Sequence, residues 1–303
     1  MFASNLYSQS VKQDFLTLGF GAGIHGLSYN LNGYGDKKSN MGYKFQIGYK
    51  HLFTQKIGIA TGLEFVNYNS SATTNFVQPI ERAVDEDNKN YTHRTYFNDL
   101  EENQKINQLA IPIEMVYVID LVSKLSLQID AGFYVGIPVG NNFKTASGNL
   151  ETRRFYYEQN LEIYGDYSQH HLYTRSDFKG EYDFKPTFGG LLGTQFLYSV
   201  DERLKLCAGF YGSLSFSSLV DGTDALLYNP DCMARDAYSD TKYNGVFNSN
   251  LTKKVNPFAV GFYIGLCYRI NMPLFSQNPP VPFSKNETFS FTKRNVLFLS
   301  MPW

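Results

Sequence analysis

Few residues of this chain have the types and spacing that catalysis or metal binding requires. His170-His171 lies near Asp166 and Asp177 and offers two imidazoles to a metal, but adjacent histidines in a polar segment are typical of a solvated loop. The acidic run 85–87 lacks the spaced ligands and the turn glycine of a calcium loop. The sequence contains no GxSxG, P-loop or HExxH motif. We therefore expect no catalytic residue, no metal site and no cofactor.

Composition narrows the class of protein further. The 303 residues include 27 Lys+Arg and 28 Asp+Glu, so a net charge of -1 gives no electrostatic reason to expect nucleic acid as a partner. No apolar run approaches the roughly 18 residues of a transmembrane helix. Aromatic residues make up 16% of the chain, and there are 25 glycines. This combination indicates a β protein with wide aromatic coverage, a class that includes membrane barrels.

Apolar and polar residues alternate with a period of two along the chain, and this pattern indicates the elements that hold the side chains in place. In segment 125–139 every odd position is apolar, whereas the even positions are mostly polar or small. Such a pattern predicts a β-strand, and this one exceeds the roughly 5–6 residues of a common strand. The same pattern predicts eight strands, at 14–28, 41–53, 57–69, 107–119, 125–139, 184–200, 204–216 and 258–270.

The connections between these strands alternate in length. Three are short and polar, at 52–56, 120–124 and 199–203. The others are long, at 29–40, 70–105, 141–183 and 218–256. Short turns at one end and long loops at the other are typical of outer-membrane barrels. The sequence therefore predicts an all-β fold, an eight-stranded antiparallel up-and-down transmembrane β-barrel with long extracellular loops.

The polar face of each strand determines which side meets the lipid. A narrow soluble barrel could not hold so many large apolar side chains inside, whereas a membrane barrel turns them outward and encloses small and charged residues. Both signs of charge occur on the polar faces, as buried charges require. We expect a mixed-sign network inside the barrel, made of Lys44, Glu64, Glu114, Asp130, Lys205 and Arg269.

Several strands also resemble a known family. Segment 104–117, with its apolar-Pro-apolar centre Ile111-Pro112-Ile113, is similar to a strand of the PorT-like outer-membrane β-barrels of Bacteroidota. Segments 127–136, 188–193 and 267–270 also fit that family. The resemblance covers roughly 11–270 and implies an OmpA-type eight-stranded barrel in the bacterial outer membrane. Because its motifs are degenerate and its members share no single activity, it transfers no functional residues.

The ends of the chain suggest how it is organised. Residues 1–10 resemble the end of a secretory signal, which would leave 11–270 as the barrel and 271–303 as a periplasmic tail. Cys207 and Cys267 fall on interior faces of consecutive strands at equal depth, so we expect a directly opposed pair; whether they are bonded stays open. Cys232, in the last long loop, should stay unpaired.

Function is less constrained than fold. The long loops are rich in aromatic and charged residues, and Arg153, Arg154, Tyr156 and Tyr157 form a candidate surface-recognition loop because Arg and Tyr favour binding surfaces. The leading hypothesis is a non-enzymatic barrel with a structural or surface-interaction role, or an accessory subunit of an envelope complex. Its expected partners are outer-membrane lipid, lipopolysaccharide and another envelope protein. The alternatives are an outer-membrane lipid-modifying enzyme and a narrow pore.

Overall fold

The computed structural model describes residues 13–85, 87–164, 174–229 and 242–270, and these residues form an antiparallel β structure. None of the described helices is both long enough and apolar enough to cross a membrane. The eight long strands are β1 (Gln13–Ser28), β3 (Met41–Leu52), β4 (Ile57–Val84), β5 (Asn90–Val122), β6 (Leu125–Tyr156), β10 (Thr187–Ser199), β11 (Leu204–Ser215) and β14 (Asn256–Ile270).

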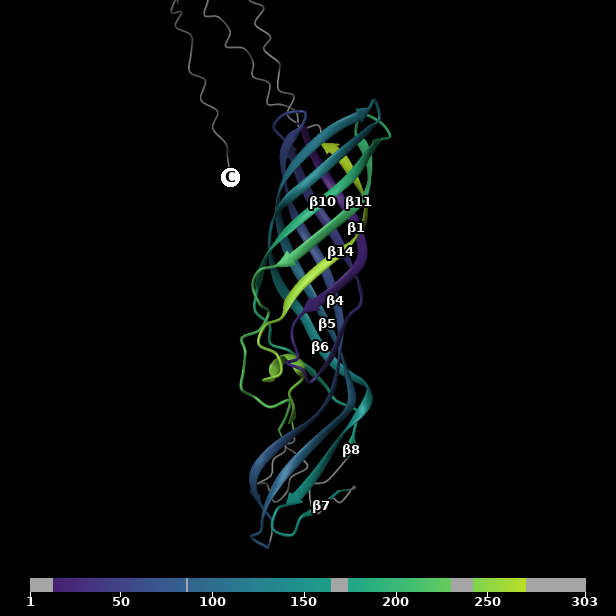
Figure 1. The fold of residues 1–303 in the computed structure, drawn as a ribbon. Helices are drawn as coiled ribbons and strands as arrows, with labels where there is room; N and C mark the ends of the chain where they lie inside the picture. Colours follow the sequence, from purple (N-terminus) through teal and green to yellow (C-terminus); the bar gives the residue numbers. More distant parts are fainter. Residues whose placement is uncertain (1–12, 86, 165–173, 230–241, 271–303) are drawn as a thin grey trace, which may run out of the picture. The chain divides into compact units, whose positions relative to one another are not determined.

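These eight strands close into a ring (Figure 1). Each pairs with the next in the chain, and β1 pairs with both β3 and β14, so that no edge remains along the ring. Gly19, for example, lies opposite Gln46 on one side and Gly265 on the other. The predicted up-and-down eight-stranded barrel is confirmed, and so are the three short turns that follow β3, β5 and β10.

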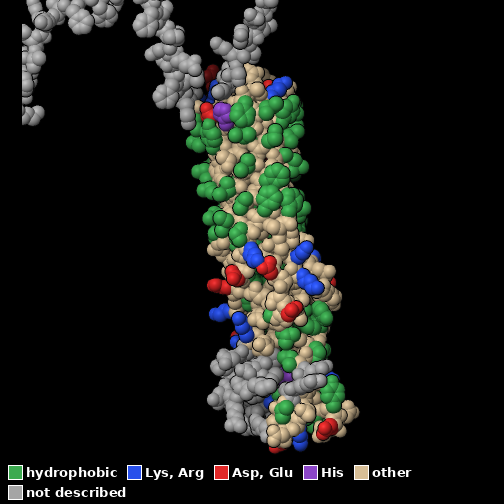
Figure 2. All heavy atoms as spheres, turned by 90° about the vertical axis from the view of Figure 1, so that its left-hand side faces the viewer, with side chains coloured by type: hydrophobic (Ala, Val, Ile, Leu, Met, Phe, Trp, Pro, Cys, Tyr) green, Lys and Arg blue, Asp and Glu red, His purple; other side chains and the backbone are tan. Residues whose placement is uncertain are grey.

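The outer wall of the barrel is apolar. Its exposed side chains form what we call the apolar belt, in which each strand contributes the residues of one parity (Figure 2). On β5 these are Leu109, Ile111, Ile113, Met115 and Tyr117. Large apolar side chains covering a closed ring of strands are stable only against hydrocarbon, so the barrel is a transmembrane one.

The predicted loops 70–105 and 141–183 are largely strand, which corrects that part of the sequence analysis. β4, β5 and β6 continue past the other five strands (Figure 1). β4 stays paired with β5 as far as Val84 opposite Asn90, and β5 stays paired with β6 as far as Thr92 opposite Phe155. We call the part beyond the belt the extramembrane sheet; the short strands β2 (Gly35–Ser39), β7 (Leu161–Ile163), β8 (Thr174–Arg175) and β9 (Lys179–Glu181) pair along its edges.

A second, smaller correction concerns the start of β10. The sequence pattern placed Phe184 on the lipid-facing side of a strand 184–200, but β10 begins at Thr187. Phe184 instead packs against the apolar core outside the membrane, because the chain still follows the inner side of the extramembrane sheet at that point. The predicted leader 1–10 and tail 271–303 lie outside the described residues.

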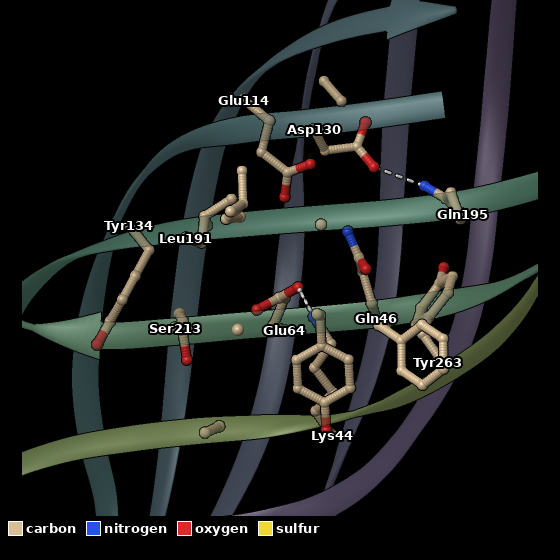
Figure 3. A pocket seen from close by; sticks show the side chains of 18 of the residues that line it. Lys44, Gln46, Glu64, Glu114, Asp130, Tyr134, Leu191, Gln195, Ser213 and Tyr263 are labelled. Carbon is tan, nitrogen blue, oxygen red and sulfur yellow. Dashed lines mark hydrogen bonds and ion pairs between the residues drawn. The ribbon is translucent and has the colours of Figure 1, made fainter. Parts of the chain in front are cut away.

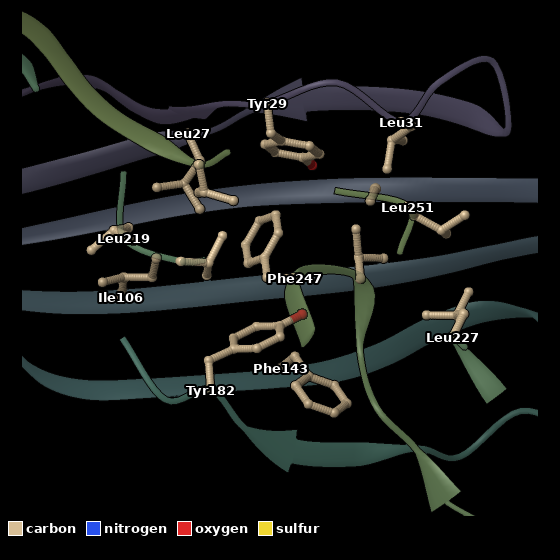
Figure 4. Close-up of a cluster of buried hydrophobic side chains, with 14 of the residues drawn as sticks. Leu27, Tyr29, Leu31, Ile106, Phe143, Tyr182, Leu219, Leu227, Phe247 and Leu251 are labelled. Carbon is tan, nitrogen blue, oxygen red and sulfur yellow. The ribbon is translucent and has the colours of Figure 1, made fainter. Parts of the chain in front are cut away.

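Two apolar clusters fill the interior at different levels. The lower cluster closes the end of the barrel that carries the short turns, which is the end drawn at the top of Figure 1. Its members are Phe15, Leu52, Val116, Val118, Leu197, Cys207, Tyr263 and Cys267. The upper cluster lies where the long connections begin, between the extramembrane sheet and the segment 218–256, which includes the short 3-10 helix η2 (Val246–Asn248) and the two-residue strands β12 (Tyr228–Asn229) and β13 (Lys242–Tyr243) (Figure 4).

Candidate functional site

A polar cavity of about 80 Å³ lies inside the barrel between the two apolar clusters. Four of the predicted interior residues line it: Lys44 from β3, Glu64 from β4, Glu114 from β5 and Asp130 from β6 (Figure 3). They meet there because each occupies the inward parity of its strand at nearly the same height. The register pairs Gln46 with Glu64 and Glu114 with Gly132. Lys44 and Asp130 each lie two residues along from these pairs, on the same inward face.

Hydrogen bonds connect most of the charged groups in this cavity. Lys44 Nζ lies 2.9 Å from Glu64 Oε1, and both side chains are largely buried. Asp130 accepts from Gln128 Nε2 at 2.6 Å and from Gln195 Nε2 at 2.7 Å. Such pairing is what makes buried charges tolerable inside a protein.

Lys50 belongs to the same network, and the sequence analysis did not select it. Its Nζ donates to Gln128 Oε1 at 2.7 Å, so it reaches Asp130 through one amide. The signal was present, because Lys50 has the same even parity as Lys44 on β3.

Glu114 differs from the other acids of the cavity. Its carboxylate points into the space between Glu64 and Asp130 (Figure 3). Within the described residues it forms no hydrogen bond or ion pair that would match the positive partner expected for it. Of the predicted network, Lys44 and Glu64 therefore form a direct ion pair. Asp130 is held by amide side chains, and the Glu114 carboxylate lies in the same cavity.

Lys205 and Arg269 lie nearer the short turns and do not join this group. Lys205 lines a separate small cavity with Lys50 and Phe15, and its Nζ lies 5.5 Å from the Phe15 ring centroid. Arg269 is half-buried at the inward parity of β14, and its side chain makes no ion pair among the described residues. The six predicted residues thus occupy two levels of the interior.

The two interior cysteines are close but not directly opposed. Cys207 pairs with Gly265 and Lys205 pairs with Cys267, so the predicted register is wrong by two residues. The cysteines therefore lie diagonally across β11 and β14, as buried free thiols with 3.9 Å between their Sγ atoms. Cys232 lies outside the described residues.

The upper apolar cluster closes the cavity toward the long connections. At its base His25, fully buried, bonds through Nδ1 to the Asn67 carbonyl at 2.9 Å and through Nε2 to the Tyr211 hydroxyl. Above it, side chains of segment 218–256 pack on the inner side of the extramembrane sheet (Figure 4). Together with the lower cluster, this packing places apolar side chains at both ends of the cavity.

Glu102 ties segment 218–256 to the sheet. This fully buried carboxylate of β5 accepts from the Tyr182 hydroxyl, from Gln104 Nε2 at 2.9 Å and from the backbone N–H of Val246 at 3.1 Å. Burial raises the pKa of Glu102, and these hydrogen bonds act in the opposite direction. A hydrogen-bond acceptor inside an apolar core fixes the position of η2, because no apolar side chain could accept from the Val246 amide.

The predicted recognition residues lie at the end of β6 and are mostly engaged within the protein. Arg154 is buried, with its Cζ 4.6 Å from the Tyr91 ring centroid, and Tyr156 is buried beside the same ring. Arg153 forms ion pairs with Glu151 and Glu162. Strand alternation accounts for this outcome, because it turns Arg154 and Tyr156 to the inner side of the sheet.

Tyr157, the fourth predicted recognition residue, follows the last residue of β6 and is 65% exposed. Leu161 and Tyr164, which continue the same connection, are also exposed. The sequence analysis did not select Leu161, and it did not separate Tyr156, which strand alternation buries, from its exposed neighbour Tyr157.

The remaining candidates for chemistry find no support as a site. His170-His171 and Asp166 lie outside the described residues, while Asp177 pairs with Arg175 at 3.0 Å. The Asp85 carboxylate accepts backbone N–H groups of the turn that follows it. Among the residues that the structure places, no group of three or more His, Cys, Asp or Glu could hold a metal ion.

Comparisons with known proteins add only distant likenesses. No protein-family model and no curated protein matches the chain. Among solved structures, Neisserial surface protein A is 11% identical, with 85% of this chain and 97% of that chain covered and a TM-score of 0.36. Ail of Yersinia pestis is 9% identical (86% and 98% covered, TM-score 0.33), and a major outer membrane protein of Thermus thermophilus is 9% identical (85% and 99% covered, TM-score 0.35). The fold assignment made above depends on the strand register alone.

Proposed function

We propose that this protein is a non-enzymatic β-barrel of the bacterial outer membrane with a structural or surface-interaction role. The apolar belt is the observation that carries the proposal, because a closed ring of strands with a lipid-facing wall is the β structure that crosses a membrane. A chain of this kind places its short turns in the periplasm and its long connections outside the cell. The extramembrane sheet then lies on the cell surface.

The extramembrane sheet supports an interaction role over a purely structural one. A barrel needs only enough chain outside the membrane to join its strands, yet here three strands continue into a sheet with its own apolar core. The far end of that sheet exposes Tyr157, Leu161 and Tyr164. Aromatic side chains offer large contact areas at low entropic cost, so this tip suits binding to another envelope protein or a surface partner.

The closed interior argues against the narrow pore. Apolar clusters lie above and below the polar cavity, and the cavity holds only a few water molecules. A lipid-modifying enzyme would need a nucleophile and a base together at the lipid face, and the charged groups that line the cavity are inside the wall. Membership of the PorT-like barrels of Bacteroidota is a further part of the proposal, and the resemblance of segment 104–117 supports it.

Cell fractionation and electrophoretic mobility test this proposal together. The protein should be recovered with outer-membrane fractions, and a folded barrel should migrate faster in detergent gels before heating than after it. Planar-bilayer recordings of the purified chain should show no stable conductance. Recovery in a soluble fraction, or mobility that heating does not change, would contradict the barrel; a stable large conductance would contradict the closed interior.

A further inference from the structure

Just beyond the apolar belt, one row of paired residues crosses five strands of the extramembrane sheet. It runs from Lys38 of β2 through Ser71, Asn103 and Lys144 to Lys179 of β9. The adjacent row contributes Lys105 of β5, which lies opposite Asn142. We call Lys105, Lys144 and Lys179 the lysine cluster. The side chains of all three are exposed on the outer side, because their strand neighbours Ile106, Phe143 and Phe178 are buried on the inner one.

The lysine cluster carries three positive charges, and two acids lie near Lys179: Asp177, which is itself paired with Arg175, and Glu181. Lys144 and Lys179 lie directly opposite each other, an arrangement in which like charges repel. Within the residues that the structure describes, no ion pair includes a lysine of the cluster. The two rows contain one acid, Glu181, opposite Asn142. Two lysines that repel each other, with neither in an ion pair, favour a role in binding an external anion.

The height of the cluster on the barrel indicates which anion. The last exposed apolar pair on β5 and β6 is Leu109 with Ile137, and Lys105 precedes Leu109 by four residues on β5, farther from the membrane. For a tilted strand this is about 10 Å beyond the hydrocarbon edge, within the reach of a lysine side chain from the headgroup layer. A lipid that places its acyl chains on the belt at Leu109 therefore has its headgroup beside the lysines.

We propose that the lysine cluster docks the phosphate groups of a phosphorylated glycolipid in the outer leaflet. This inference rests on the proposed function, which places the extramembrane sheet on the cell surface. Lysine binds phosphate as a flexible point charge, and three lysines on a flat sheet suit a headgroup with more than one phosphate. The same lipid contacts the apolar belt and the cluster at once, which a soluble acidic partner cannot do.

Lipid binding to the full-length chain in phosphatidylcholine nanodiscs tests the proposal. The probes are bisphosphorylated lipid A, dephosphorylated lipid A and inorganic phosphate. The triple variant Lys105→Gln/Lys144→Gln/Lys179→Gln should bind bisphosphorylated lipid A at least about tenfold more weakly than the parent chain, since each lysine near a charged surface contributes to attraction. The parent chain should prefer the phosphorylated probe over the dephosphorylated one by a similar factor.

A matched control removes the same charge at the other end of the barrel. Lys56, Lys124 and Arg203 are exposed in the short turns, and their triple replacement by Gln should leave lipid A binding within about twofold of the parent. Equal loss in both triple variants, equal binding of both lipid probes, or displacement of the lipid by inorganic phosphate at comparable concentration would each overturn the proposal. Insertion into nanodiscs and heat-dependent mobility are measured first on every variant, so a failure of the barrel itself is recognised separately.

Discussion

The membrane barrel and the extramembrane sheet are built from the same strands but distribute polarity in opposite ways. On β5 within the membrane, Ile113 faces outward and is 66% exposed while Glu114 faces the cavity. Farther along the same strand, Lys105 faces outward while Ile106 is buried. The inner face is polar in one region and apolar in the other. The solvent outside each region, hydrocarbon or water, determines which arrangement is stable.

The boundary between the two regions is sharp. It falls between Leu109, the last lipid-facing residue of β5, and Lys105, and on β6 it coincides with a bulge opposite Asn107 and Gln108. The bulge adds one residue to β6, so the inward positions change from even to odd numbers between Tyr134 and Phe143. A strand can thus pass from one solvent to another by reversing which of its faces is apolar.

The largest effect is expected inside the membrane, from the ion pair of the cavity. Lys44→Met leaves the buried Glu64 beside Glu114 without its cation and should lower the free energy of unfolding by about 3–5 kcal/mol. Urea unfolding in lipid vesicles measures this. The double variant Lys44→Met/Glu64→Leu should recover most of the loss, because it removes both charges; a double variant as unstable as the single one would show that the pair is not the source of the cost.

The next prediction compares the outer face of the barrel, which meets hydrocarbon, with the outer face of the extramembrane sheet, which meets water. Ile113→Arg places a charge in the middle of the belt on β5 and should cost about 2–4 kcal/mol. Asn103→Arg makes the same kind of outward substitution on the same strand, in the extramembrane sheet, and should cost less than about 1 kcal/mol, which includes repulsion from Lys144 directly opposite. Similar costs for both, in the same vesicle unfolding assay, would place the boundary elsewhere.

A smaller effect is expected from one methylene group. Ile106 is 1% exposed in the upper apolar cluster, and Ile106→Val should destabilise by about 0.5–1.5 kcal/mol. Ile111 on the same strand is 45% exposed, and Ile111→Val should change stability by less than about 0.5 kcal/mol. If Ile111→Val proved the more costly of the two, the lipid-facing assignment of the odd positions would be wrong.

The sequence alone was sufficient for the barrel and insufficient for the sheet above it. In segment 107–119 every odd position from 109 to 119 is apolar, so alternation identified the strand. In 100–106 the apolar residues Leu100 and Ile106 have even numbers. The apolar face of the strand has changed from its odd to its even positions there, so the segment resembled a loop. Parity also placed the interior charges on the correct face, but it could not give their heights, since the register of each pair decides which side chains meet.

The last prediction concerns Glu102, and its effect is the smallest because hydrogen bonds offset part of the cost of its burial. The pKa of Glu102 is higher in the folded chain than in the unfolded one. The folded state therefore retains the proton over the window between the two values, and stability should fall as the pH rises through that window. Glu102→Gln keeps an acceptor for the Val246 amide but cannot ionise, so its urea midpoint should depend less on pH than that of the parent chain. Unfolding measured from mildly acidic to neutral pH, with Glu101→Gln on the outer side of the same strand as the control, compares the two. Equal pH dependence in the parent and in Glu102→Gln would mean that other groups set it, and that η2 is held to the sheet by its apolar contacts alone.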